Sequence, residues 1–388
     1  MDTSHTPPDV ERLRALTGIK WRHFEDDVIP AWVADMDFPT APAIIDALGS
    51  MVATSDFGYN GAAFDDSIPK AWADWSFTRF GWRPETERTK VLSTTLQPIA
   101  IALSLATSPG DGVLLFTPVY PPFFSIVKKL GRRVVEYPLN ETGWRIEADR
   151  LRSAIDAGTR ALVLANPHNP SGRSFDAAEL KSVADVAEEY DLLVISDEIW
   201  QDFVYADGAG HIPFASLGAD AANRSVIVTS ASKSFSLGGL GCAVAYLGDA
   251  KVAEGIAALP PQLLGGVNAL GAQATLAAWA RGDQWLSGVV ATLRANRDHL
   301  VSRLASELPE VAVQTPEATY LAWLDFRATS IAHDPAGRLL RDGRVGLSPG
   351  PDFGAAGTGF ARLNFATYRE VLDEVIDRIV RTVQAERL

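Results

Sequence analysis

Apolar residues occur in short unbroken runs through the middle of the chain. Runs of this kind, bounded by turn residues, are typical of strands buried on both faces. The runs that predict strands are Val113–Phe116, Val134–Tyr137, Ala161–Ala165, Leu192–Ile195, Val226–Thr229 and Ala243–Leu247. Helical spacing of apolar residues occurs between several of them, at Pro98–Ala106, Pro122–Leu130 and Ala177–Tyr190. This alternation predicts an α/β fold with a mostly parallel sheet covered by helices.

The pattern changes toward both ends of the chain. The first 40 residues are rich in Pro, Trp and Asp and show no clear period, and helical periods follow at Ala43–Val52 and Ile68–Phe80. Beyond about residue 285 the predicted elements are a long helix, two strands and two further helices, at Trp285–Glu307, Tyr320–Phe326, Ala361–Phe365, Ala336–Arg341 and Arg369–Glu386. We therefore expect a large α/β domain over residues 46–285, and a smaller α+β domain made of residues 286–388 with the N-terminal segment 1–45.

Composition and charge exclude several classes of protein. The 388 residues are 47% hydrophobic and 21% charged, which is typical of a globular chain. A net charge of −13 repels phosphate backbones, so we expect no nucleic-acid partner. The single cysteine, Cys242, argues against a disulfide framework and a cysteine-based metal site. We expect a cytoplasmic protein without a membrane partner, because we find no signal peptide and no apolar run near the roughly 20 residues of a membrane helix.

Lys233 lies in the segment SASKSF, directly after the predicted strand Val226–Thr229. A lysine between small polar residues at a strand end can be partly desolvated, which makes its amine a nucleophile able to form a Schiff base. The hydroxyls of Ser230 and Ser232 could hold a phosphate. The alternative is a loop lysine that points into solvent.

Asp197 lies in the segment SDEIW, after the predicted strand Leu192–Ile195. Its position alone leaves two interpretations open. Asp197 could be a helix N-cap or a Mg²⁺ ligand. It could also be a carboxylate that pairs with a protonated ring nitrogen and keeps a cofactor electron-poor.

Two Asn-Pro pairs occur within the segment NPHNPSG, residues 166–172. Each proline forces the preceding residue out of the helical region, so both amides are held in a rigid extended loop that can present hydrogen bonds. Gly172 then allows a tight turn. The alternative is an ordinary loop, and we interpret His168 as a loop histidine rather than a catalytic one.

Tyr120 lies in TPVYPPF, a loop stiffened by prolines. A rigid aromatic ring at this position could stack on a planar ligand, and the alternative is a core aromatic. All four segments follow predicted strands, and ligands of open parallel sheets bind outside the carboxyl ends of the strands. We therefore expect the four segments to meet in one site.

In this order the four segments resemble the fold-type-I pyridoxal-phosphate (PLP) enzymes, the class I/II aminotransferase superfamily. The resemblance makes Lys233 the Schiff-base lysine and Asp197 the partner of the pyridine nitrogen. It makes Asn169 a ligand of the ring oxygen and of the substrate carboxylate, and Tyr120 the stacking aromatic. ARLNFAT, near the C-terminus, resembles the segment that bears the α-carboxylate arginine, here Arg362. The planar fork of an arginine matches a carboxylate bidentately, and the alternative is a surface arginine on a strand.

Within this superfamily the chain resembles the MalY/PatB group of cystathionine β-lyase-like C–S lyases. WVADMDFPTAP, residues 32–42, and FGY, residues 57–59, resemble the opening signatures of that group. The resemblance implies that Ala34 contacts the substrate. It also implies that Tyr59 reaches the phosphate of the other subunit's cofactor. We therefore expect a homodimer with shared active sites.

The predicted phosphate loop departs from the group. Thr-Thr-Leu-Gln-Pro, residues 94–98, stands where the group usually has Pro-Gly-Val-Val-Pro. The loop still precedes a helix, whose first backbone N–H groups can bind a phosphate. We therefore expect Thr95, Leu96 and Gln97 to contribute to cofactor binding.

Two further departures bear on the cofactor pocket. Trp200, which has a single N–H to donate, stands where aminotransferases usually have Tyr and the lyase group often has His. Gly241 stands where many relatives outside the group have an Arg that binds the phosphate. We expect Trp200 to border the cofactor. The departures at Trp200 and Gly241 bear on the identity of the substrate more than on that of the cofactor.

The resemblance implies a PLP-dependent C–S β-lyase that converts L-cysteine S-conjugates such as cystathionine into a thiol, pyruvate and ammonia. An aminotransferase, which shares the first steps, is one alternative. A specialised biosynthetic C–S lyase or decarboxylating relative acting on a larger S-conjugate is another. A regulatory module without catalysis is disfavoured because Lys233, Asp197, Asn169 and Arg362 are all retained.

Overall fold

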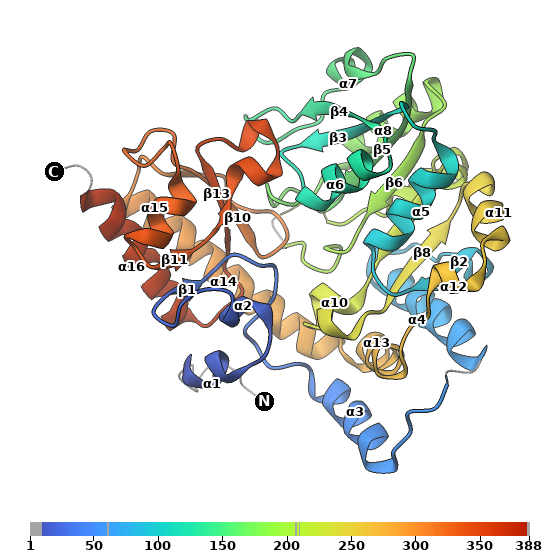
Figure 1. The fold of residues 1–388 in the computed structure, drawn as a ribbon, viewed down its shortest axis with the longest axis horizontal. Helices are drawn as coiled ribbons and strands as arrows, with labels where there is room; N and C mark the ends of the chain where they lie inside the picture. Colours follow the sequence, from blue (N-terminus) through green and yellow to red (C-terminus); the bar gives the residue numbers. More distant parts are fainter. Residues whose placement is uncertain (1–9, 60–61, 206–207, 209, 386–388) are drawn as a thin grey trace. The chain divides into compact units, whose positions relative to one another are not determined.

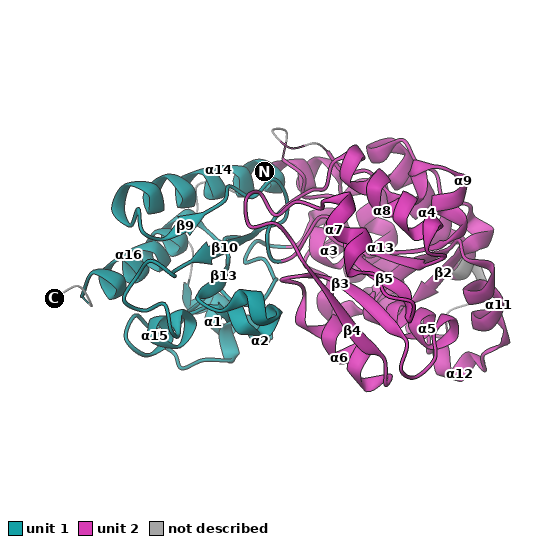
Figure 2. Ribbon diagram, turned by 90° about the horizontal axis from the view of Figure 1, so that it is seen from above, with its two compact units in different colours: residues 1–39, 170–172, 289–388 teal, residues 40–169, 173–288 magenta. Residues whose placement is uncertain are grey.

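The protein divides into two compact units, which Figure 2 shows in different colours. The structure is a computed structural model that describes residues 10–59, 62–205, 208 and 210–385. Unit 1 contains residues 1–39, 170–172 and 289–388, and unit 2 contains residues 40–169 and 173–288. The chain therefore passes out of unit 2 and back within the Asn-Pro segment.

A mostly parallel sheet forms the centre of unit 2 (Figure 1). Among the described residues it has seven strands in the order β2-β8-β7-β6-β5-β3-β4. Their bounds are β2 Thr89–Leu92, β3 Gly112–Thr117, β4 Arg133–Pro138, β5 Thr159–Ala165, β6 Leu193–Asp197, β7 Ser225–Thr229 and β8 Ala243–Leu247. The pairs that include β8 are antiparallel and the other pairs are parallel. The expected α/β class, with a mostly parallel sheet covered by helices, is confirmed.

Helices cover both faces of this sheet (Figure 2). One face packs in a single apolar cluster with α5 (Leu96–Ala106), α6 (Pro121–Lys129) and α11 (Ala250–Ala258). On the other face lie α4 (Ala62–Phe80), α8 (Ala177–Glu189) and α13 (Ala269–Arg281). Successive strand residues point to opposite faces, so a strand covered on both sides needs an unbroken apolar sequence, as GVLLFT of β3 has.

Shorter helices complete unit 2. They are α3 (Pro42–Thr54), α7 (Ala148–Ala154), α9 (Ala219–Asn223), α10 (Ala231–Ser234), α12 (Pro261–Leu264), η1 (Thr86–Arg88), η2 (Phe214–Leu217) and η3 (Gly238–Leu240). In the described ranges, no helix of either unit has the length and apolar character that a membrane span requires.

The sequence pattern missed strand β2 and several helices of unit 2, among them α7, α11 and α13. Strand β2 lies at the edge of the sheet, is only partly buried, and carries polar residues at half of its positions. Helix α13 is rich in alanine, which gives little contrast between its buried and exposed faces. Hydrophobic periodicity therefore identified the central elements and failed where burial is partial or side chains are small.

Unit 1 is built on a four-stranded antiparallel sheet in the order β12-β13-β10-β9, as far as its described residues show. A short parallel pair, β1 with β11, joins the N-terminal segment to the C-terminal part. The strands are β1 Ile29–Pro30, β9 Ala312–Val313, β10 Leu321–Asp325, β11 Val345–Gly346, β12 Ser348–Pro349 and β13 Phe360–Asn364. The helices are α1 Val10–Ala15, α2 Ile19–Arg22, α14 Asp283–Glu307, which begins in unit 2, α15 Pro335–Arg341, α16 Arg369–Ala385, η4 Gly350–Phe353 and η5 Ala355–Gly357.

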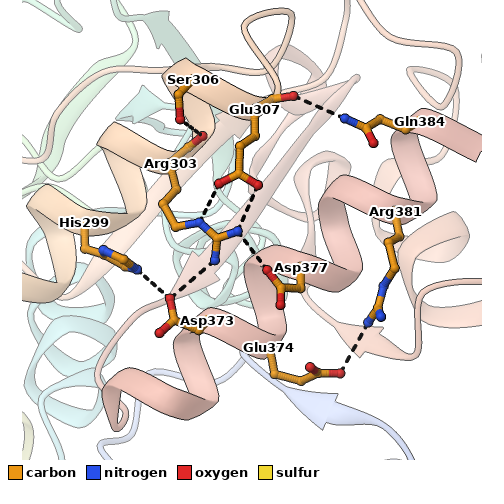
Figure 3. Close-up of polar contacts among 9 residues, drawn as sticks. All are labelled: His299, Arg303, Ser306, Glu307, Asp373, Glu374, Asp377, Arg381 and Gln384. Carbon is orange, nitrogen blue, oxygen red and sulfur yellow. Dashed lines mark hydrogen bonds and ion pairs between the residues drawn. The ribbon is translucent and has the colours of Figure 1, made fainter.

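Polar contacts join helices α14 and α16 within unit 1 (Figure 3). Arg303 of α14 binds Glu307 on its own helix, with Nε 2.6 Å from Oε1, and Asp377 of α16, with Nη2 2.8 Å from Oδ1. His299 adds a contact of 2.5 Å from Nε2 to Oδ1 of Asp373. The guanidinium of Arg303 lowers the pKa of the Glu307 carboxyl. These contacts fix the long helix against the C-terminal helix.

Candidate active site

The four segments singled out in the sequence follow four neighbouring parallel strands of unit 2. Tyr120 follows β3, Asn169 follows β5, Asp197 ends β6, and Lys233 lies in α10 directly after β7. Because the carboxyl ends of parallel strands lie at one edge of the sheet, the four side chains start from the same edge. Strand β2 has the same direction as β7, so the loop at residues 93–97 also begins there.

Lys233 is held on a single turn of helix. Ser230 caps this turn, because its Oγ accepts a hydrogen bond from the backbone N–H of Ser232 at 3.0 Å. The same Oγ donates to the carbonyl of Cys242 at 2.6 Å. The Lys233 side chain is half-buried, and its Nζ lies 5.8 Å from the ring centroid of the buried Trp200. The ring of Trp200 therefore covers Lys233, unlike the solvent-facing lysine of the alternative interpretation.

Asp197 is buried, with 4% of its surface exposed. Its Oδ1 accepts a hydrogen bond from the backbone N–H of Ile199 at 3.2 Å. Burial raises the pKa of the Asp197 carboxyl to about 7; the backbone hydrogen bond lowers it, nearby Glu198 raises it, and Lys233 lowers it. No described helix begins at this position, so Asp197 is not a helix N-cap.

Glu198, beside Asp197, makes a separate set of buried contacts. Its carboxylate accepts hydrogen bonds from the hydroxyl of Ser196 and the backbone N–H of Phe214, both at 2.9 Å, and its Oε2 lies 3.0 Å from Nε2 of His211. These contacts fix the turn after β6 and hold Glu198 in the scaffold.

The Asn-Pro segment is held by buried contacts of its first residues. Oδ1 of Asn166 accepts from the backbone N–H of Phe175 at 3.0 Å, and the Asn166–Pro167 peptide bond is cis. Nε2 of His168 lies 3.2 Å from the carbonyl of Phe116, and burial lowers the pKa of this histidine to about 4. His168 is therefore a neutral scaffold residue, in line with its interpretation as a loop histidine. Asn169, the proposed ligand, is the middle residue of this segment and is buried.

Gly172 fulfils the expected turn role within unit 1. Its φ is +70°, which disfavours any residue with a Cβ. A Cβ at this position would lie 2.7 Å from Cβ of Pro316 and 3.1 Å from the carbonyl oxygen of Ala318. The carbonyl of Gly172 accepts the backbone N–H groups of Glu317 and Ala318. Both conformation and space therefore require glycine.

Tyr120 stands at the N-cap position of α6 and is only partly buried. Its ring meets the ring of Phe123 edge to face, with centroids 5.7 Å apart. The tyrosine is therefore not a fully buried core residue, and its position after β3 is compatible with a ring that faces a ligand.

Gln97, the second residue of α5, holds neighbouring segments in place with its side chain. Oε1 of Gln97 accepts from the backbone N–H of Ser93 at 3.2 Å, and Nε2 donates to the carbonyl of Leu264 at 2.5 Å. Thr95 is the buried N-cap residue of the helix and Leu96 begins it. The groups suited to an anion are therefore the backbone N–H of Leu96 and the Thr95 hydroxyl, because Gln97 donates its backbone N–H to Oγ1 of Thr94 at 3.3 Å, Pro98 has no N–H, and the side-chain amide of Gln97 is already bonded.

The two serines near Lys233 also differ in whether their hydroxyls are already hydrogen-bonded. Ser230 donates its only hydroxyl proton to Cys242, so it supports the loop and has no proton for a phosphate. The hydroxyl of Ser232 makes no hydrogen bond to the described residues, and the side chain is half-buried. Ser232 is therefore the serine better suited to bind an anion.

Tyr59 is fully exposed in the single chain, and Phe57 beside it is 55% exposed. Both follow helix α3 of unit 2. Contiguous exposed apolar patches are typical of surfaces that contact a partner, whereas single exposed apolar residues are common.

Arg362 lies in unit 1, on the central strand β13, and is 5% exposed. Its Nη2 donates to the carbonyl of Trp32 at 2.8 Å and to Oγ of Ser348 at 3.1 Å. Its guanidinium lies over the ring of Phe353, 4.9 Å from the centroid. The interpretation as a surface arginine is therefore wrong.

Residues 32–35 are held by side-chain donors at four successive carbonyls, all within unit 1. Arg362 binds the carbonyl of Trp32, and Nδ2 of Asn364 binds those of Val33 and Asp35 at 2.7 Å. The hydroxyl of Tyr320 donates to the carbonyl of Ala34 at 3.2 Å. The backbone at Ala34, the expected substrate contact, is consequently fixed from both sides.

A buried ion pair fixes the end of the same segment. Nζ of Lys20 lies 2.8 Å from Oδ2 of Asp37 and donates to the carbonyl of Asp35 at 3.0 Å. Nε1 of Trp21 donates to Oδ1 of Asp37 at 2.7 Å. Sequence reasoning missed the roles of Lys20 and Trp21, because nothing in the irregular N-terminal sequence indicates which residues become buried partners.

Comparison with known proteins identifies the family of this chain. The family model "Aminotransferase class I and II" matches residues 33–379. The chain belongs to this family. Cystathionine β-lyase PatB of Bacillus subtilis is 35% identical over 358 residues, which cover 91% of this chain and 92% of that protein. A cystathionine β-lyase of Corynebacterium glutamicum is 32% identical and covers 96% of this chain and 98% of its own.

Solved structures agree with this assignment. The crystal structure of cystalysin from Treponema denticola, which contains a pyridoxal 5′-phosphate cofactor, matches with a TM-score of 0.90. It is 26% identical and covers 96% of this chain and 97% of that one. This chain and cystalysin therefore share one fold over nearly their whole lengths.

Proposed function

We propose that this protein is a PLP-dependent C–S β-lyase that cleaves L-cysteine S-conjugates such as cystathionine. The products are a thiol, pyruvate and ammonia, with one water consumed. The observation that carries the proposal is the set Tyr120, Asn169, Asp197 and Lys233 at the ends of four neighbouring strands. The family assignment and the two cystathionine β-lyases similar over nearly the whole chain support it.

The residues of unit 2 fit the cofactor by their chemistry. Lys233 offers an amine for covalent attachment, and Asp197 offers a buried carboxylate for a protonated ring nitrogen. The start of α5 and the hydroxyl of Ser232 suit a phosphate, and Tyr120 suits an aromatic ring. We accordingly propose residues 46–285 as the cofactor-binding domain.

The cofactor, when bound, supplies an electron sink for the negative charge that develops on Cα of the amino acid. Lys233 then acts as the base that removes the Cα proton and as the group that carries this proton. Arg362 and Asn169 hold the α-carboxylate and orient the Cα–H bond, and such positioning can be worth several kcal/mol of barrier. The negative charge on Cα then expels the thiolate from Cβ. Trp200 covers Lys233 within the site.

A product assay tests the proposed function. The purified protein, loaded with PLP, is incubated with cystathionine and a panel of cysteine S-conjugates, with and without a keto acid. We expect equal amounts of thiol and pyruvate without any keto acid, and no turnover by Lys233→Ala. Amino-group transfer that requires the keto acid, without release of thiol, would instead make the protein an aminotransferase.

We also propose that the active protein is a homodimer in which Tyr59 serves the partner's cofactor. The exposure of Tyr59 and Phe57 supports this, as do Ile45 and Val52, which α3 exposes seven residues apart on one face. An obligate interface of this kind buries more than roughly 2,000 Å².

Complementation between two inactive variants tests the shared site. Subunits carrying Tyr59→Ala and Lys233→Ala are dissociated reversibly, mixed and reassociated. In each hybrid dimer, one site combines native Lys233 with native Tyr59, so we expect part of the wild-type activity to return. A fully active monomer, or mixing that restores nothing although hybrids form, would contradict the proposal.

A further inference from the structure

A second buried carboxylate, five residues beyond Asp197, contacts the helical turn that carries Lys233. Asp202 is 4% exposed. Its Oδ2 accepts a hydrogen bond of 2.6 Å from the hydroxyl of Ser234, the residue after Lys233. Its Oδ1 accepts from Nε1 of Trp75 at 3.1 Å and lies 3.0 Å from Nε of Arg79.

These contacts join three elements of unit 2 that are distant in sequence. Trp75 and Arg79 belong to α4, Asp202 belongs to the segment after β6, and Ser234 ends α10. Arg79 also binds Asp283 at the start of α14, with Nη1 2.7 Å from Oδ1. The carboxylate of Asp202 is therefore anchored to helix α4 by one oxygen and accepts the hydroxyl of Ser234 with the other.

Helix α10 needs such support because it contains only four residues. A single turn has almost no stability of its own, since nucleation of a helix costs more than its first hydrogen bond returns. Ser230 fixes the N-terminal end of the turn through Cys242. Ser234 fixes the C-terminal end through Asp202, with a short hydrogen bond of 2.6 Å from its hydroxyl to a buried carboxyl oxygen.

We propose that Asp202 is a positioning residue for Lys233, acting through the hydroxyl of Ser234. The clamp formed by Ser230 and Ser234 sets the position and direction of the Lys233 side chain. Asp202 itself contacts no reacting atom. The inference rests on the proposed function, in which Lys233 binds the cofactor and moves the Cα proton.

The test removes the hydroxyl of Ser234 and compares it with a matched serine. Ser234→Ala deletes one atom and leaves the contacts of Asp202 with Trp75 and Arg79 in place. Ser76→Ala, on α4, deletes the same atom from a serine that is equally buried and whose hydroxyl makes no hydrogen bond to the described residues. Both variants are prepared with PLP and compared with the wild type.

Three readouts distinguish positioning from general stability. They are the pH titration of the bound cofactor's visible absorbance without substrate, the rate of cofactor release, and kcat and KM with cystathionine. For Ser234→Ala we expect kcat to fall by about tenfold or more with KM within about twofold, because misplacement of a reacting group acts on the chemical step. We expect the midpoint of the absorbance titration to move and cofactor release to accelerate. Ser76→Ala should match the wild type in all three.

A double-mutant cycle identifies the partner. If the hydroxyl acts through Asp202, then Ser234→Ala has little further effect in an Asp202→Ala background, which removes the acceptor of its hydrogen bond. An equal loss in both backgrounds, or a Ser234→Ala variant that matches Ser76→Ala in every readout, overturns the inference while the lyase assignment stands. A wild type that cleaves no conjugate overturns the proposed function, and the absorbance titration and cofactor release still decide the clamp.

Discussion

Asp197 should lower the stability of the cofactor-free protein at neutral pH. Its carboxyl is buried and has no basic side chain in a hydrogen bond among the described residues, and burial raises its pKa to about 7 from the ordinary value of 3.8. Ionisation of this group in the folded state is therefore unfavourable. The replacement Asp197→Asn keeps the shape of the side chain and removes the charge.

The sign and size of the effect follow from proton linkage. Between pH 3.8 and about 7 the folded protein retains a proton that the unfolded chain has lost, so its stability falls as the pH rises through this window. The two pKa values differ by an amount that corresponds to about 4 kcal/mol, at about 1.4 kcal/mol per pH unit. Above pH 7 this cost is fully present, and below pH 3.8 it is absent.

Urea denaturation of the cofactor-free proteins tests the magnitude. We expect Asp197→Asn to be more stable than the wild type by up to about 4 kcal/mol at pH 8, with a difference that shrinks steadily toward pH 4. Asp220→Asn, at an exposed position, serves as the control and should show no such trend. A difference that is independent of pH, or a variant less stable than the wild type at pH 8, would refute the reasoning. With PLP bound, the same variant should lose most of its activity, because we propose Asp197 as the charged partner of the ring nitrogen.

Two further predictions concern unit 1. Lys20→Met leaves the carboxylate of Asp37 buried without its ion-pair partner, so we expect a loss of about 3–5 kcal/mol in the free energy of unfolding, partly recovered when Asp37→Asn is added; a change below about 1 kcal/mol would contradict the buried pair. Arg362→Ala should raise KM for amino-acid substrates by at least about tenfold, because a carboxylate loses a bidentate partner, whereas Ser348→Ala, which removes only a neighbour of Arg362, should change KM far less. Steady-state kinetics measure KM for both variants. An unchanged KM in Arg362→Ala would mean that another residue binds the substrate carboxylate.

Local patterns in the sequence determined the central elements and the candidate chemistry. Strands β3 and β5 to β8 are buried on both faces along most of their length, so each contains an apolar run that a short window of sequence reveals, whereas the edge strand β4 alternates between buried and exposed residues. Lys233, Asp197 and Asn169 follow such runs directly, and an open parallel sheet gathers strand ends at one edge. These inferences needed only the order of residues along the chain.

Tertiary structure alone decided which polar side chains form hydrogen bonds that stabilise the fold instead of binding a ligand. Ser230 and Gln97 looked suited to a phosphate, but their hydrogen bonds go to Cys242 and Leu264, which are distant in the sequence. Asp202 likewise gains its role from Trp75 and Ser234. Hydrogen-bond partners separated by many residues are set by how the helices and strands pack, and hydrophobic periodicity carries no information about them.

The N-terminal segment shows the same limit most clearly. Its sequence has no period, because it is held by single donors from Tyr320 and Asn364 and by the pair of Lys20 with Asp37 rather than by a continuous apolar face. The cost of burying those charges is offset only when every partner is in place. The backbone of the same segment is bonded by Asn364, a residue more than 300 positions away along the chain, and only the folded structure brings the two together.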